Sequence, residues 1–148
     1  AFMKICCFFC AGVVMQRGDR NYVDELDGVG KEMPLVMTCF TIAGISLVGI
    51  PPLSGFVSKW KLAESALATA DPILTIGAAV LLYSALMTAV YILTIVVRAW
   101  FPVKDSSVTN LTASVGWRMK LPLVFFTVII VLFGLYAQPL ISFLEKLI

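Results

Sequence analysis

Histidine is absent from this 148-residue sequence, and charged residues are scarce: Asp, Glu, Lys and Arg together make up 14% of the chain, against about 25% in an average soluble domain. Without histidine, a mixed His/Cys metal site is excluded. The four cysteines all lie in apolar segments, where we expect them to pack as small apolar residues rather than to bind metal or form disulfides. They are Cys6, Cys7, Cys10 and Cys39.

Motifs for cofactors and nucleic acids are also missing. No segment matches a recognisable motif for a flavin, an iron–sulfur cluster or a quinone, so we predict no cofactor and no metal. The basic residues form no run or patch that could follow a phosphate backbone, so we predict no binding to nucleic acid. The chain is not expected to carry out redox chemistry of its own.

Charge is missing altogether from three stretches, residues 33–58, 72–97 and 121–144. Each can cross a bilayer, which takes about 20 predominantly apolar residues. A fourth apolar stretch, residues 5–16, is too short to cross alone, and we expect it to be the end of a truncated span. The sequence therefore predicts an integral membrane protein in contact with the lipid bilayer, with its N-terminal part missing.

The expected fold class is all-α: a polytopic bundle of transmembrane helices, one of which is discontinuous. The expected helices cover residues 1–16, 34–50, 55–70, 73–100 and 118–145. The polar loops 17–32 and 102–117 lie on one side if residues 34–70 form a single broken crossing. Because most Lys and Arg residues lie in or beside these loops, the positive-inside rule places both loops in the cytoplasm and the C-terminus on the outer side.

The segment GIPPLSGFVSKW, residues 49–60, is unlike a simple span. Pro51 and Pro52 have no N–H to donate to the carbonyls of Leu47 and Val48, and their rings clash with the preceding turn. The helix must kink or break there. Inside a membrane, the freed carbonyls are tolerated only where protein or a watery cavity satisfies them, and broken helices of this kind mark ion and substrate sites in transporters.

Lys59 is the residue that this break singles out. Ser54 is expected to cap the second half-helix, Gly55 follows it in the break segment, and Lys59 lies about one turn further on. The positive end of the helix dipole and poor solvation both disfavour a charged ammonium, so we expect Lys59 to exchange its proton easily. The alternative is that Lys59 extends to an interface, where Lys61 and Glu64 indicate polar surface.

Lys4 is the second ionisable residue in an apolar helix, and no acidic residue lies within one turn of it. It either lines a hydrated path, pairs with a residue outside this sequence, or extends to the interface. Ser84, Thr88 and Tyr91 share one face of the expected helix 73–100. They could line a polar path, or they could bond to a neighbouring helix as membrane hydroxyls commonly do.

Three segments together resemble a known family. They are AFMKICCFFCAGVVM, RNYVDELDGVGKEMPL and FTIAGISLVGIPPLSGFVSKW. They resemble the C-terminal half of the antiporter-like subunits shared by respiratory complex I, Mrp-type sodium/proton antiporters and membrane-bound hydrogenases. The resemblance implies two inverted repeats, each with a broken helix that carries a proton-transfer residue. Lys59 matches that residue of the second repeat, and Lys4 matches the central lysine of the helix before it.

The resemblance implies proton or cation translocation by the subunit of a respiratory or hydrogenase complex, through buried lysines, with redox chemistry left to partner subunits. It equally fits a subunit of a stand-alone Mrp-type antiporter. A third hypothesis is a non-conducting membrane scaffold, in which Lys59 and Lys4 would face lipid headgroups. The expected partners are the N-terminal half of the same protein and other membrane subunits, and the expected location is the bacterial inner membrane.

Overall fold

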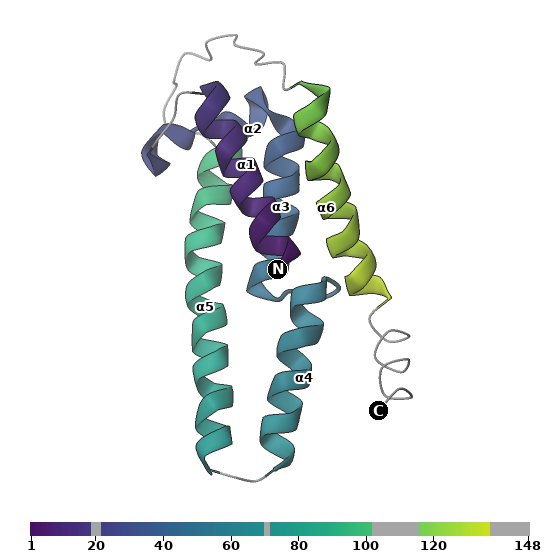
Figure 1. The fold of residues 1–148 in the computed structure, drawn as a ribbon. Coiled ribbons are helices and arrows are strands. Elements are labelled where there is room, and N and C mark those ends of the chain that lie inside the picture. Colours follow the sequence, from purple (N-terminus) through teal and green to yellow (C-terminus); the bar gives the residue numbers. More distant parts are fainter. Residues whose placement is uncertain (19–21, 70–71, 102–115, 137–148) are drawn as a thin grey trace.

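The computed structural model describes residues 1–18, 22–69, 72–101 and 116–136, and every regular element among them is helical (Figure 1). The elements are α1 (Phe2–Gly18), the short 3-10 helix η1 (Val23–Leu26), α2 (Val29–Glu32), α3 (Pro34–Val48), α4 (Ser54–Ala68), α5 (Pro72–Trp100) and α6 (Trp117–Leu135). The predicted all-α fold class is confirmed.

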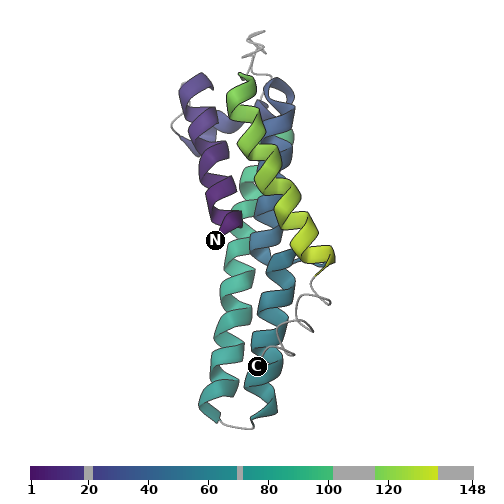
Figure 2. The same cartoon turned by 45° about the vertical axis from the view of Figure 1, so that its right-hand side comes forward.

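The helices α3 and α4 follow one another end to end beside the single long helix α5 (Figures 1 and 2). The 29 residues of α5 make a helix about 43 Å long, which exceeds the roughly 30 Å hydrocarbon thickness of a bilayer. By the same rise, the 15 residues of α3 reach only about 22 Å. One crossing in this part of the chain therefore needs both α3 and α4, as predicted for a broken span.

The predicted helix limits agree with the structure to within two residues at most ends. The first helix extends to Gly18, and α6 is described only as far as Leu135, so the predicted continuation to residue 145 lies outside the described residues. The predicted loop 17–32 contains η1 and α2 and is thus not wholly irregular. The cause is tertiary: the Gly28 N–H donates to the Arg98 carbonyl at 3.4 Å, which holds this segment against α5.

Two helices are long and apolar enough to cross a membrane by themselves, namely α5 and α6, while α1 and α3 are shorter apolar helices. The end of α1, the start of α3, the end of α5 and the start of α6 all lie at one end of the bundle in Figure 1. This arrangement agrees with the predicted placement of both polar loops on one side. Residues 102–115 of the second loop lie outside the described residues.

The core forms where α1, α3 and α6 pack together. Its buried side chains include Cys6, Cys10, Val13, Val36, Cys39, Ala43, Leu123 and Ile130. Three of the four cysteines are therefore packed among apolar neighbours, and the Cys6 sulfur lies 3.7 Å from the hydroxyl of Thr127 on α6. The interpretation of Cys6, Cys10 and Cys39 as packing residues is confirmed.

Helix α5 is attached to α3 near its C-terminal end. The Trp100 indole N–H donates to the Thr41 hydroxyl at 3.2 Å, and a Cβ atom on Gly44 would lie only 2.7 Å from the Ile92 side chain. The contact therefore depends on a glycine that lets the helices approach closely. Most other apolar side chains of α5 are exposed, as is typical of a helix that faces lipid or further helices.

Candidate functional site

The predicted helix break is confirmed between α3 and α4. Gly49 ends α3 in the left-handed conformation, with φ 95° and ψ 43°, and its N–H donates to the Ile45 carbonyl at 3.1 Å. Only glycine adopts this conformation without a steric penalty. The Leu53 N–H then donates to the Ile50 carbonyl at 3.2 Å, which closes the turn over Pro51 and Pro52. Helix α4 starts at the next residue, Ser54.

Lys59 returns to this break and bonds to it. Its ammonium donates to the Leu47 carbonyl at 2.9 Å and to the Val48 carbonyl at 2.8 Å. These are the two carbonyls that Pro51 and Pro52 leave without an intrahelical donor, because a proline has no N–H to offer the residue four positions earlier. The side chain of Lys59 thus replaces the two backbone hydrogen bonds that the prolines remove.

The path of the Lys59 side chain follows from its position on α4. Side chains of an α-helix tilt toward its N-terminus, so a lysine in the second turn of α4 extends back over the break. Gly49 leaves room for it, since a Cβ atom there would lie 3.0 Å from the Lys59 Cδ atom and 3.6 Å from its Nζ atom. The ammonium meets the negative end of the α3 dipole there, which stabilises a positive charge.

Ser46 and Gly55 connect the two half-helices directly. The Gly55 N–H donates to the Ser46 hydroxyl oxygen at 3.3 Å, and Ser46 has no exposed surface. A Cβ atom on Gly55 would overlap the Ser46 carbonyl, so the two backbones can approach this closely only at a glycine. The predicted supporting role of Gly55 has this close approach as its physical basis, whereas nothing in the sequence predicts the role of Ser46.

The prediction that Ser54 caps α4 is wrong. The N-cap residue is Leu53, which is extended with φ −82° and ψ 159° and has no side-chain cap. Helix α4 therefore begins one residue earlier than a Ser54 cap requires, and Ser54 is its first helical residue. Its hydroxyl lies 3.4 Å from the Ser46 hydroxyl, on the side that faces α3. The first-turn amide of Gly55 is satisfied from α3 instead.

Helix α6 covers the break from a further side. A Cβ atom on Gly134 would overlap the Pro52 carbonyl and lie 2.7 Å from the Leu53 Cα atom. This backbone contact between α6 and the turn shields the break. It also explains how a segment with so few regular hydrogen bonds is held in the bundle.

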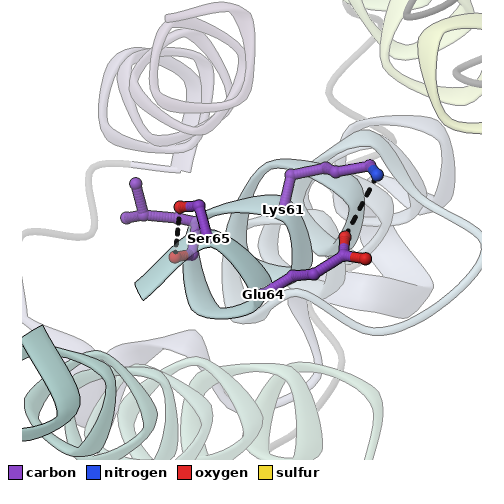
Figure 3. Close-up of polar contacts among 4 residues, drawn as sticks. Lys61, Glu64 and Ser65 are labelled. Atoms are coloured by element: carbon purple, nitrogen blue, oxygen red, sulfur yellow. Dashed lines mark hydrogen bonds and ion pairs between the residues drawn. The ribbon is translucent and has the colours of Figure 1, made fainter. Parts of the chain in front are cut away.

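Lys61 and Glu64 form a separate, exposed ion pair on α4 (Figure 3). The Lys61 Nζ atom lies 3.1 Å from a Glu64 carboxylate oxygen, and the two side chains are 53% and 56% exposed. Lys59 differs from both, because it is half-buried and its ammonium is bonded at the break. The alternative in which Lys59 extends to the polar surface beside Lys61 is therefore not the arrangement that the structure has.

Lys4 lies on the exposed side of α1, whereas its neighbour Met3 turns inward. The Met3 sulfur would lie 3.3 Å from a Cβ atom on Gly55. Among the described residues, no hydrogen bond or ion pair joins Lys4 to Lys59. The structure thus brings α1 to the break but does not bring these two lysines together.

The hydroxyl-bearing residues of α5 lie on its accessible side. Ser84 and Tyr91 are exposed and Thr88 is half-buried. The Thr88 hydroxyl donates to the Ser84 carbonyl of its own helix at 2.8 Å. A polar path along this face stays a prediction.

Comparison with known proteins gives a family match over the part of the chain that contains the break. A family model described as "NADH:quinone oxidoreductase/Mrp antiporter, TM" matches residues 1–88, which include α1, α3, α4 and both candidate lysines.

Three curated relatives show the range of assemblies in which similar sequences occur. The N subunit of the NADH-quinone oxidoreductase of Desulforudis audaxviator is 37% identical over 100 residues, covering 68% of this chain and 19% of the relative. A Na(+)/H(+) antiporter protein of Bacillus subtilis, one of the subunits of that antiporter, is 34% identical over 140 residues, covering 94% of this chain and 27% of the relative. The N subunit of the F(420)H(2) dehydrogenase of Methanosarcina mazei is 39% identical over 74 residues, covering 44% of this chain and 15% of the relative. The chain thus spans less than a third of the length of these relatives.

Proposed function

The chain belongs to the transmembrane family of NADH:quinone oxidoreductase and Mrp antiporter subunits, and from this premise we propose that it translocates protons, or another cation, as part of a longer antiporter-like subunit. The chain is accordingly an integral membrane protein. Lys59 is the residue that takes up and releases the proton. Pro51, Pro52 and Gly55 shape the break that holds it.

One observation carries this proposal: the Lys59 ammonium bonds to the two carbonyls that the prolines leave free. An ammonium has three N–H donors, and the break uses two of them. A neutral amine still has two, so the break can be satisfied in both protonation states of Lys59. The third proton is the one that can be exchanged without unsealing the helix.

Ionisable residues inside a membrane commonly mark proton relays and ion pathways, and broken helices provide binding sites in transporters. Both features meet at Lys59. A non-conducting scaffold, in which Lys59 would face lipid headgroups, is disfavoured because its ammonium bonds to the break. The names of the relatives divide between redox complexes and an antiporter, so both settings stay open, with redox chemistry in partner subunits in the first.

The remaining parts of the proposal concern the path. We place Lys4 as a second relay residue that exchanges protons through groups outside these residues, because it is exposed on α1. Ser84, Thr88 and Tyr91 are a candidate polar path on α5. We propose that the subunit lies in a bacterial inner membrane, with loops 17–32 and 102–117 in the cytoplasm, the C-terminus on the outer side, and other membrane subunits around it.

The test uses the full-length protein in its complex, reconstituted in vesicles, with proton flux measured by a pH-sensitive dye. Lys59→Ala is expected to abolish flux. Lys59→Arg is expected to do so as well, because a guanidinium cannot be deprotonated in a protein. Lys61→Ala serves as the matched control two residues away and is expected to retain flux. Wild-type flux in Lys59→Ala vesicles would refute the role of Lys59.

A further inference from the structure

Two contacts hold the half-helices together at the break, and they lie next to each other on both helices. On α3, Ser46 is followed directly by Leu47 and Val48. On α4, Gly55 and Lys59 are four residues apart and so share one face of the helix. The Ser46 hydroxyl meets the Gly55 amide, and one turn later the Lys59 ammonium meets the two carbonyls.

The contact made by Ser46 satisfies a donor that α4 cannot satisfy by itself. Gly55 is the second residue of α4, and the first-turn N–H groups of a helix have no intrahelical acceptor. Its acceptor at 3.3 Å is a side chain of the other half-helix. Because Ser46 has no exposed surface, water does not readily take its place. The start of α4 is therefore tied to one particular point on α3.

We propose that Ser46 is a positioning residue for Lys59, whose hydroxyl fixes the start of α4 so that the Lys59 ammonium meets the carbonyls of Leu47 and Val48. This inference rests on the proposed function of Lys59 in translocation. Ser46 does not itself contact the exchanging proton. It acts through Gly55, from which the helical spacing sets the place of the Lys59 Cα atom.

The neighbouring Ser54 does not replace this role. Its hydroxyl lies 3.4 Å from that of Ser46, but it belongs to α4 itself and so cannot tie α4 to α3 without Ser46. Removal of the Ser46 hydroxyl leaves the Gly55 amide without its acceptor. The start of α4 then becomes free to shift, and the ammonium of Lys59 spends less time on the carbonyls.

The experiment compares Ser46→Thr with Ser46→Val in the full-length protein in its complex. The two replacements have nearly the same shape, but only threonine keeps the hydroxyl acceptor. Each variant is treated briefly with a small amine-reactive acetylating reagent, and the acetylation of Lys59 is measured by mass spectrometry relative to that of Lys61 in the same molecule. Lys61 is exposed and paired with Glu64, away from the carbonyls of the break, so it reports general reactivity.

The relative acetylation of Lys59 is expected to rise about fivefold in Ser46→Val and to stay near the wild-type value in Ser46→Thr. Proton flux is expected to fall about fivefold in Ser46→Val and to be largely retained in Ser46→Thr. Ser46→Ala adds no volume and is a second test if valine does not fit, with the same rise expected. Equal acetylation of Lys59 in wild type, Ser46→Ala and Ser46→Val would overturn the proposal, as would an equal rise in the threonine and valine variants.

The acetylation measurement is independent of the proposed function. If Lys59→Ala vesicles keep wild-type flux, the role of Lys59 in translocation fails, whereas the acetylation ratio still tests whether Ser46 positions its ammonium. If flux is lost in Lys59→Ala but the acetylation ratio does not respond to Ser46, the proposed function stands and the positioning role fails.

Discussion

Replacing Lys59 with methionine is expected to lower the free energy of unfolding of the full-length protein markedly. Methionine keeps an unbranched, flexible stem of similar length, so the packing of the aliphatic part is largely retained. What is lost is the donor to two carbonyls, at 2.9 and 2.8 Å. Hydrogen bonds to a charged group contribute about 1.5–3 kcal/mol each. Because Lys59 is only half-buried and water can reach part of the site, the lower end applies, for a total of about 3 kcal/mol.

The measurement is reversible unfolding in mixed micelles with increasing SDS, followed by far-ultraviolet circular dichroism. Lys61→Met is the matched control, because it makes the same chemical change two residues away. Its ion pair with Glu64 is more than half exposed, and such surface pairs contribute about 0.5 kcal/mol. A Lys59→Met protein that unfolds within about 0.5 kcal/mol of wild type, a change expected only for a surface pair, would refute the idea that Lys59 satisfies the broken helix.

Two glycines at the break give further predictions in the same assay. Gly55→Ala is expected to destabilise the protein by at least about 2 kcal/mol, because the added carbon would overlap a carbonyl of α3 and overpacking costs about 1–3 kcal/mol or more. Gly49→Ala is expected to cost about 1–2 kcal/mol, because its φ of 95° is unfavourable for residues with a Cβ atom. Gly77→Ala is the control for both, since no atom lies within 4 Å of the added carbon; equal effects at all three positions would contradict the close approach.

The break itself can be predicted from the sequence because its cause is local. Pro51 and Pro52 lack N–H groups wherever they stand, and an apolar stretch that continues past them must be interrupted. The same reasoning singles out Lys59, since a charge in a poorly solvated segment needs a partner. The identity of that partner is not predictable, because it depends on the direction in which α4 leaves the turn.

The errors of prediction at the site have a related cause. Serine is favoured at helix N-caps, which predicts a cap at Ser54, yet the extended backbone of Leu53 starts α4 one residue earlier. Ser46 gives no signal beyond being a serine in the last turn before two prolines. Its role is visible only when α4 is placed against α3, at the point where Gly55 lets the backbones touch. Propensity rules describe one helix at a time, whereas this contact belongs to two.

The number of prolines matters for the chemistry proposed for Lys59. A single proline would free one carbonyl, and a neutral amine would then keep a donor with no partner at the break. Two prolines free two carbonyls, which equals the number of N–H groups of a neutral amine. Methionine in this position would satisfy neither carbonyl, and arginine would satisfy both but could not release its proton. A lysine facing two consecutive prolines therefore lets the charge change by one unit while the backbone of the break keeps its hydrogen bonds. That combination joins the stability of the broken helix to its proposed use in proton transfer.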